Sequence, residues 1–254
     1  MLYQDEHLVA VHKPAGMLIH RSRIDRAASR FLLQTVRDQI GQRVYPVHRL
    51  DKPTAGIVLM ALMPAIARSL SEQFASALVE KQYLAICRGY SEAQQRIDYP
   101  LVEPFDPTTD QLADRDKPAQ AAHTDLQRLA TVELPQAVGR YPTARYSLLL
   151  LQPRTGRRHQ LRRHLKHIFH PIIGDTTYGD GRHNQFFRRH FGNHQLMLCA
   201  WRLRLRHPGK GDELTLQTHP ETSFSDVLAR APWKLDPAAA CPSLIRTYFN
   251  SESN

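Results

Sequence analysis

Residues 48–62 read His48-Arg49-Leu50-Asp51-Lys52-Pro53-Thr54-Ala55-Gly56-Ile57-Val58-Leu59-Met60-Ala61-Leu62, a charged loop followed by an unbroken apolar run. The apolar run at 57–62 predicts a buried strand. Pro53 and Gly56 give the preceding loop a defined shape. A carboxylate held on such a loop, at a strand end, can act as a nucleophile or base, although Asp51 taken alone is more often an ordinary turn residue.

The rest of the chain mixes short strands with helices. Apolar runs predict strands, and apolar residues at helical spacing predict helices, one of them opened by Pro64. We expect strands at 8–11, 81–87, 146–151, 196–205 and 213–216, and helices at 31–40, 159–168 and 222–231. Because strands and helices do not alternate regularly, we predict an α+β fold with a mixed, mostly antiparallel central sheet flanked by helices.

The segment 92–122 is polar and contains prolines, so we interpret it as an exposed connection between two lobes. Residues 1–235 are expected to form one domain, with a loosely ordered tail at 236–254.

Charge gives the first indication of a partner. There are 34 Lys and Arg against 24 Asp and Glu, a formal net charge of +10. Arginine grips phosphate oxygens bidentately, so a basic chain of this kind favours a polyanion such as RNA. The alternative is a basic surface without function.

Several other classes are disfavoured by composition. Cys87, Cys199 and Cys241 form neither a disulfide framework nor a C-x-x-C motif. No apolar run approaches the length of a membrane span, and the start lacks a signal peptide. We therefore expect a cytoplasmic protein without membrane contact, and a monomer because no heptad seam appears.

A second charged stretch lies at 154–165, where an apolar strand passes into the helix expected at 159–168. Helical spacing places Arg158 and Arg162 on one face, with Leu161 and Leu165 on the other. An arginine on the inward edge can keep a catalytic carboxylate ionised and oriented. The alternative interpretation is a solvated basic face.

Together these motifs resemble the RluA family of pseudouridine synthases. The matching stretches are Lys13-Pro14-Ala15-Gly16, His48-Arg49-Leu50-Asp51, Lys81-Gln82-Tyr83, Thr155-Gly156-Arg157-Arg158-His159-Gln160-Leu161-Arg162 and His170-Pro171-Ile172-Ile173-Gly174-Asp175. They occur in the family's order from about residue 2 to about residue 216. The resemblance implies the pseudouridine synthase fold, with a catalytic cleft between two lobes. Many members carry a small S4 domain before the catalytic region, and we expect none here.

The resemblance also implies roles for individual residues. Asp51 would act on the target nucleotide, Arg162 would pair with Asp51, and Tyr83 would pack against the flipped uracil. Arg49 would help to displace that base, whose extrusion from a stem costs a few kcal/mol. Further RNA contacts are expected from His48, Arg49, Lys81, Arg157, Arg158, His159, Gln160, Arg188 and Arg189. Isomerisation needs no redox step or group donor, so no cofactor is implied.

The details are most similar to a bacterial branch that modifies uridine-65 in the T-stem of tRNA. The alternatives are a synthase acting on 23S rRNA and, less favoured, a non-catalytic RNA-binding protein. Residues 179–195 interleave arginines with phenylalanines. This pattern fits a loop that binds the RNA backbone and stacks on bases, or equally a surface loop anchored by buried phenylalanines. Cys199 stands where the family usually has His, which puts local packing there in doubt.

A metal enzyme is the remaining alternative, suggested by the 14 histidines. His164, His167 and His170 are spaced by three, but neither the deaminase nor the H-E-x-x-H motif is present. We therefore expect no metal.

Overall fold

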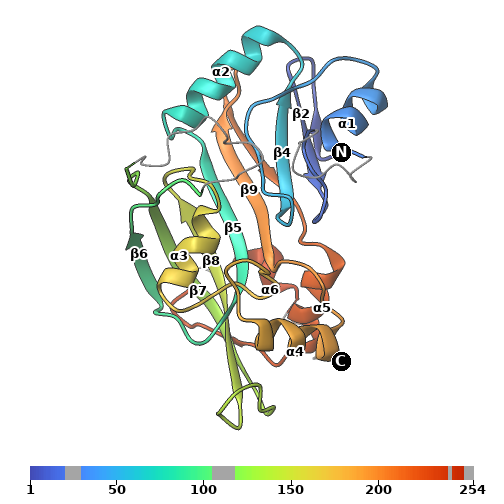
Figure 1. Cartoon of the computed structure of the whole chain (residues 1–254). Helices are drawn as coiled ribbons and strands as arrows, with labels where there is room; N and C mark the ends of the chain where they lie inside the picture. The colour runs from blue at the N-terminus through green and yellow to red at the C-terminus, as the bar shows by residue number, and fades with distance from the viewer. Residues whose placement is uncertain (21–29, 105–117, 240–241, 249–254) are drawn as a thin grey trace.

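The computed structural model describes residues 1–20, 30–104, 118–239 and 242–248, and in these residues the chain is built around one sheet (Figure 1). The sheet has 11 strands in the order β1-β2-β4-β9-β5-β8-β7-β11, with β10 paired to β9, β3 to β4 and β6 to β7. Among the named strands of these residues, only β4 and β9 pair in parallel. The strands are β1 (Tyr3–Gln4), β2 (Leu8–Lys13), β3 (Tyr45–Pro46), β4 (Ala55–Ala61), β5 (Glu80–Arg88), β6 (Gln94–Asp98), β7 (His123–Leu134), β8 (Ala144–Pro153), β9 (Leu198–Arg206), β10 (Glu213–Gln217) and β11 (Lys234–Leu235).

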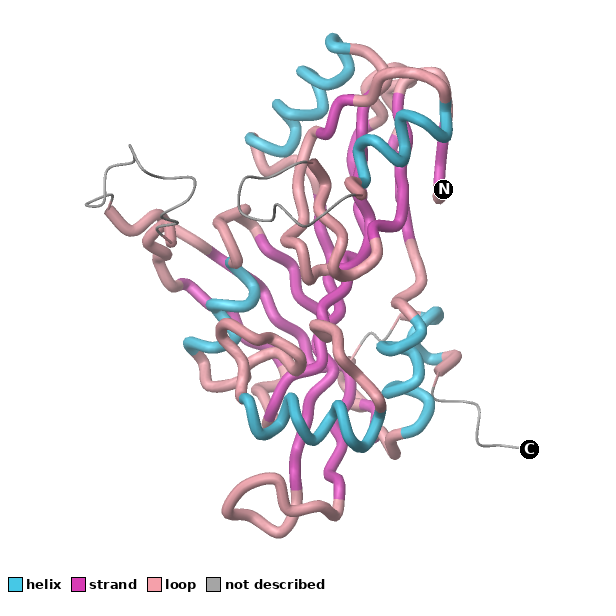
Figure 2. The backbone as a smooth tube through the Cα atoms, turned by 45° about the vertical axis from the view of Figure 1, so that its right-hand side comes forward, coloured by secondary structure: helices cyan, strands magenta, loops and turns pink. Residues whose placement is uncertain are grey.

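Helices cover this sheet at both ends (Figures 1 and 2). They are α1 (Leu32–Ile40), α2 (Pro64–Ala75), α3 (Gln160–His167), α4 (Gly181–Phe191), α5 (Thr222–Arg230) and α6 (Ser243–Arg246). The α+β class and the mostly antiparallel sheet are confirmed. No helix among the residues described is long and apolar enough to cross a membrane.

Strand β4 contains residues 57–61 of the predicted apolar run and lies at the centre of the half of the molecule drawn at the top of Figure 1, with β2, α1 and α2. All seven of its residues are buried. Because successive side chains in a strand point to opposite faces, Ile57 and Leu59 join one core with α2, whereas Val58 and Met60 join another with α1. A strand buried on both faces shows a continuous rather than alternating apolar pattern.

The parallel pairing of β4 with β9 depends on a glycine. Gly56 has a φ of +120° and pairs with Ala200 on β9. A Cβ at this position would lie 2.2 Å from the Ala200 carbonyl oxygen, so no other residue fits. This close approach sets the start of β4 directly after the loop that carries Asp51.

The largest core among the described residues lies in the half drawn at the bottom of Figure 1, where β5, β7, β8 and β9 pack against α3, α4 and α5. Its members include Tyr146, Trp201 and Phe187, each about 1% exposed or less. Cys199 is buried in this core too, at 2% exposure. The small side chain of Cys199 thus fills its place in the core.

The structure differs from the sequence-based expectations in three segments. Within 92–122, which we expected to be an exposed connection, β6 pairs with β7 as an antiparallel hairpin; residues 105–117 lie outside the described residues. The segment 179–195 is not a loop: it contains helix α4, capped by Asp180 and ended by Gly192. In the tail, helix α6 buries Ile245 completely in the core, while residues 240–241 and 249–254 lie outside the described part.

Candidate active site

A buried lysine donates a hydrogen bond to the backbone of the loop that carries Asp51. Lys13, fully buried at the end of β2, donates hydrogen bonds to the carbonyl oxygens of Pro14, Met17 and Lys52 at 2.9, 2.9 and 3.1 Å. Burial lowers the pKa of Lys13 to about 8, against the opposing effect of Glu221 and Asp51. The lysine therefore links two sequence motifs that are far apart in the chain, and it fixes the residue after Asp51.

Asp51 faces an arginine that is already paired. The Arg162 Nη1 lies 3.4 Å from Asp51 Oδ2. The other edge of the same guanidinium binds Asp175 bidentately, with Nε 2.7 Å from Oδ2 and Nη2 2.9 Å from Oδ1. The side chains of Arg162 and Asp175 are 5% and 1% exposed, whereas that of Asp51 is 19% exposed. The guanidinium thus sits between a buried carboxylate and one that reaches solvent.

Both the carboxylate and the backbone carbonyl of Asp175 accept hydrogen bonds from the protein. Its Oδ1 also accepts hydrogen bonds from the backbone N–H groups of Thr177 and Tyr178, both at 2.9 Å. Asn184 on α4 donates to its backbone carbonyl at 2.8 Å. Burial raises the pKa of Asp175, but the bonds from Arg162 and from the backbone outweigh it and hold that pKa below its usual value. Asp175 therefore stays ionised and orients Arg162.

A histidine completes the surroundings of Asp51. His159 Nε2 lies 3.9 Å from Asp51 Oδ2, and His159 Nδ1 lies 3.0 Å from the Tyr178 hydroxyl. The Tyr178 ring in turn lies against the Arg162 guanidinium, 5.1 Å from its centroid. Burial, Arg162 and Arg158 lower the pKa of His159, while Asp51 and Asp175 act in the opposite sense. The ring is accordingly neutral near pH 7.

Tyr83 and Lys81 approach the same region from β5. Both are half-buried. Burial, followed by the Asp51 charge, raises the pKa of Tyr83 well above its ordinary value. Lys81 Nζ donates to the Thr155 carbonyl at 3.4 Å, and burial lowers its pKa. Asp51 thus lies in contact with Arg162 and close enough to Tyr83 for its charge to raise the pKa of the phenol. The catalytic roles of these three residues stay a prediction.

Two other residues of the His48-Arg49-Leu50-Asp51 motif point in different directions. Arg49 is exposed next to the site. His48 stacks on the ring of Phe74, with centroids 4.6 Å apart, and its Nε2 accepts a hydrogen bond from the Leu59 backbone at 2.9 Å. Burial and the nearby Lys81 lower the pKa of His48 to about 4. Its contacts in this structure are with the protein itself.

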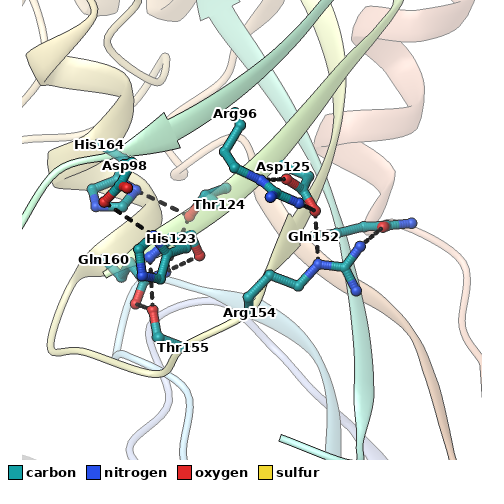
Figure 3. Close-up of polar contacts among 10 residues, drawn as sticks. All are labelled: Arg96, Asp98, His123, Thr124, Asp125, Gln152, Arg154, Thr155, Gln160 and His164. Carbon is teal, nitrogen blue, oxygen red and sulfur yellow. Dashed lines mark hydrogen bonds and ion pairs between the residues drawn. The ribbon is translucent and has the colours of Figure 1, made fainter. Parts of the chain in front are cut away.

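Gln160 is directed into the protein interior (Figure 3). It is 5% exposed, and its Oε1 accepts from the Thr155 hydroxyl at 2.7 Å. Its Nε2 donates to the His123 carbonyl at 2.9 Å and to Thr124 Oγ1 at 3.0 Å. These bonds lock the turn before α3 against β7, and so determine where α3 begins.

Arg158 lies before helix α3, whose N-cap is His159 and whose first residue is Gln160. It therefore does not share a helical face with Arg162, which corrects that expectation. Arg157 is exposed and donates to the Ala121 carbonyl at 3.1 Å. Arg188 and Arg189 are exposed on α4, while Phe187 and Phe191 of the same helix anchor it in the core.

The histidines spaced by three make contacts within the fold. His164 lies between Thr124 Oγ1 and the Tyr99 carbonyl, both at 3.0 Å. His167 stacks on Tyr99, and His170 contacts the Arg88 carbonyl at 2.9 Å. Elsewhere in the described residues, Asp5, His7 and His207 place ligand-type atoms within 4.8 Å of one another. In that cluster Asp5 is also contacted by the Lys210 ammonium at 3.2 Å, a cation that competes with a metal.

Sequence reasoning missed Asp175 and Tyr178 as members of the site. Asp175 was visible in the stretch His170-Pro171-Ile172-Ile173-Gly174-Asp175, but nothing in that stretch indicates its contact with Arg162. Tyr178 follows it by three residues.

A family model described as RNA pseudouridylate synthase matches residues 7–167. The chain belongs to this family. It is 53% identical over 234 residues to tRNA pseudouridine synthase C of Pectobacterium carotovorum subsp. carotovorum, covering 92% of this chain and 62% of that protein. It is 50% identical to the protein of that name in Pasteurella multocida, covering 93% and 97% of the two chains. The corresponding protein of Yersinia pestis is 49% identical, with 98% and 95% covered.

Solved structures agree with this membership. Human RNA Pseudouridylate Synthase Domain Containing 1 superposes with a TM-score of 0.69 at 24% identity, over 98% of this chain and 94% of that chain. Human RNA Pseudouridylate Synthase Domain Containing 4 has a TM-score of 0.68 at 25% identity, over 92% and 93%. The fold is therefore that of pseudouridine synthase domains. From the family model and the relatives above, the chain is an enzyme of the class that isomerises uridine to pseudouridine.

Proposed function

We propose that this chain isomerises uridine-65 in the T-stem of tRNA to pseudouridine, with Asp51 as its catalytic carboxylate. The observation that carries the assignment of Asp51 is its contact with Arg162 at 3.4 Å, at a partly exposed position close to Tyr83. The tRNA substrate is supported by relatives named tRNA pseudouridine synthase C at about half identity over nearly the whole chain.

The geometry suits this chemistry. The reaction breaks the N1–C1′ bond, turns the uracil and joins C5 to C1′. Asp51 either adds to C1′ or removes a proton from C2′, and in both routes it must start as a carboxylate. Arg162 stabilises that carboxylate by a charge-assisted contact. No cofactor or metal is required.

The remaining contacts with RNA are part of the same proposal. Tyr83 packs against the flipped uracil and Arg49 helps to fill the space that the base leaves. The exposed cations Arg157, Arg188 and Arg189 bind backbone phosphates. We propose a cytoplasmic monomer, with residues 1–235 as the catalytic domain in two lobes around the cleft.

The test is carbodiimide mapping of pseudouridine in unmodified tRNA and large-subunit rRNA, after incubation with the wild type or with Asp51→Ala. We expect a new stop in the T-stem of tRNA that is absent with the variant. A stop in rRNA alone would keep the enzyme class and reject the tRNA substrate. Modification by Asp51→Ala at the wild-type rate would remove Asp51 from the mechanism.

Binding is measured separately with Asp51→Asn, which preserves the shape of the side chain. We expect this variant to lose turnover and to retain its affinity for tRNA. Tight binding without any turnover by the wild type would instead favour a non-catalytic RNA-binding protein.

A further inference from the structure

His159 has a backbone conformation that side chains rarely adopt. Its φ and ψ are 57° and 26°, in the left-handed region, at the N-cap of α3. Ala77 and Phe169 are the other non-glycine residues with positive φ in the described chain, and neither contacts Asp51. Uncommon backbone conformations persist where the surrounding structure requires them, and they cluster at active sites. At His159 this conformation accompanies a ring placed beside Asp51.

The ring of His159 is oriented by the hydroxyl of Tyr178. The Tyr178 hydroxyl lies 3.0 Å from Nδ1, and the opposite nitrogen, Nε2, lies 3.9 Å from Asp51 Oδ2. When the Tyr178 oxygen accepts a hydrogen bond from Nδ1–H, Nε2 carries the lone pair, on the side of the ring that faces Asp51. The His159 side chain is 21% exposed, so part of the ring is open to solvent beside Asp51.

Uridine isomerisation creates a specific demand for a proton acceptor. Once C5 has joined C1′, it carries both the new bond and its original hydrogen. That hydrogen must leave as a proton to restore the conjugated ring, while N1, freed from the ribose, gains one from solvent. This step is common to both routes by which the N1–C1′ bond can break. At that point Asp51 is again a carboxylate. C5 is then bonded to C1′, so it lies close to the place where Asp51 acted.

Two side chains near Asp51 can be compared as acceptors. Tyr83 is a protonated phenol, because burial and the Asp51 charge raise its pKa. His159 is a neutral imidazole, because burial lowers its pKa; the charged groups facing it are Asp51, Arg162, Arg158 and Asp175. A neutral imidazole is the better acceptor near pH 7. The imidazolium that results would lie beside the Asp51 carboxylate, which stabilises it.

We propose that His159 is a further catalytic residue, whose Nε2 accepts the proton that leaves uracil C5 and releases it to water, with Tyr178 as its positioning residue. This inference rests on the uridine isomerisation proposed above but not on which RNA is modified. It gives His159 a chemical role in place of the RNA contact expected from its motif.

The test uses variants that suit the backbone at this position. Glycine adopts positive φ freely and asparagine is enriched there, so His159→Gly and His159→Asn should keep the turn. Single-turnover rates are measured on transcripts containing uridine or 5-deuterouridine, using an RNA that the wild type modifies. We expect the rate to fall by about 10²- to 10⁴-fold, the usual contribution of a general base. Because loss of the C5 proton then limits the rate, a primary deuterium effect larger than the wild type's should appear.

Two further measurements separate this role from a structural one. Imidazole added to His159→Gly should restore part of the lost rate and reduce the deuterium effect. Tyr178→Phe, which keeps the ring against Arg162, should show a smaller fall with a deuterium effect of its own. Affinity for the RNA, measured by filter binding, should be unchanged in each variant.

Several outcomes would overturn the proposal. A His159→Gly rate within a few-fold of wild type would exclude His159 as the general base. A slower rate that shows neither a deuterium effect nor rescue by imidazole would exclude it too. A deuterium effect in Tyr83→Phe and not in the His159 variants would assign the step to the phenol. Failure of the proposed function is distinct, because the wild type would then modify no RNA at all.

Discussion

The pair between Arg162 and Asp175 makes Asp175→Asn an informative perturbation. In the native protein the Asp175 carboxylate accepts bonds from two guanidinium nitrogens and two backbone N–H groups. An asparagine has one oxygen and one NH2 group, so in either orientation its NH2 faces donors. The substitution also removes the negative charge that compensates a guanidinium whose side chain is 5% exposed.

The magnitude follows from burial. Breaking a buried ion pair from one side costs about 3–5 kcal/mol, because an uncompensated charge remains. Asp51, at 3.4 Å from the same guanidinium, still offers partial compensation. We therefore expect the free energy of unfolding to fall by about 3 kcal/mol, at the lower end of that range.

A matched control lies on the surface of the sheet (Figure 3). Asp125 bridges two arginines, with Arg96 Nε and Arg154 Nε each 2.7 Å from its oxygens. These arginine side chains are 67% and 50% exposed. Solvent screens such pairs, so Asp125→Asn should cost less than about 1 kcal/mol. The same chemical change is thus made at similar distances and different burial.

The assay is urea unfolding of both variants at pH 7, followed by turnover of RNA under conditions where each remains folded. We expect Asp175→Asn to lower kcat more than it raises KM, because Arg162 loses the support that aims it at Asp51. Equal destabilisation by the two substitutions, or a loss below about 1 kcal/mol at Asp175, would refute the argument from burial.

Three further predictions concern other parts of the molecule. Gly56→Ala should lower the melting temperature or prevent folding, since its Cβ would lie 2.2 Å from the Ala200 carbonyl oxygen; thermal unfolding checks this, and a stable variant would contradict it. His48 has its pKa lowered to about 4, so its contribution is complete above pH 6.5 and lost as the pH falls toward 4. Urea unfolding should show a slope of up to about 1.4 kcal/mol per pH unit in that window, flattened in His48→Gln. Arg188→Ala combined with Arg189→Ala should weaken tRNA binding and reduce the salt dependence of log K by about one unit for each arginine; an unchanged slope would remove these side chains from the RNA contact.

Much of the fold was predictable from local patterns. Residues 57–61 of the predicted run lie in strand β4, which is buried on both faces, and Pro64 begins α2 as expected. Helix α4 was missed because its arginines and histidines hide the apolar positions, although Phe187 and Phe191 have the four-residue spacing of a buried helical face. Strand β6 was missed because four of its five residues are partly or fully exposed, so it lacks an apolar run.

Only the site residues that lie in the matching sequence motifs could be predicted. Asp51, Tyr83 and Arg162 could be named from their stretches of sequence, and the structure brings them together. Asp175 could not be assigned, because its pairing with Arg162 depends on a turn that brings residues after α3 back against that helix. The role of Lys13 likewise requires the tertiary structure, since it bonds to the Lys52 carbonyl 39 positions away in the chain.

The distribution of contacts around Arg162 shows how one cation can support Asp51, the proposed catalytic carboxylate, while contacting only one of its oxygens. The bidentate bonds go to Asp175, which satisfies most of the buried guanidinium and fixes its plane. A single nitrogen is left for Asp51, and both contacts that the described residues make with that carboxylate, from Arg162 and His159, go to Oδ2. In the proposed mechanism, Oδ1 is therefore the oxygen that would act on the nucleotide. Were Arg162 bidentate to Asp51 instead, both oxygens would be held in the plane of the guanidinium, and the carboxylate would have to break a strong pair before it could act.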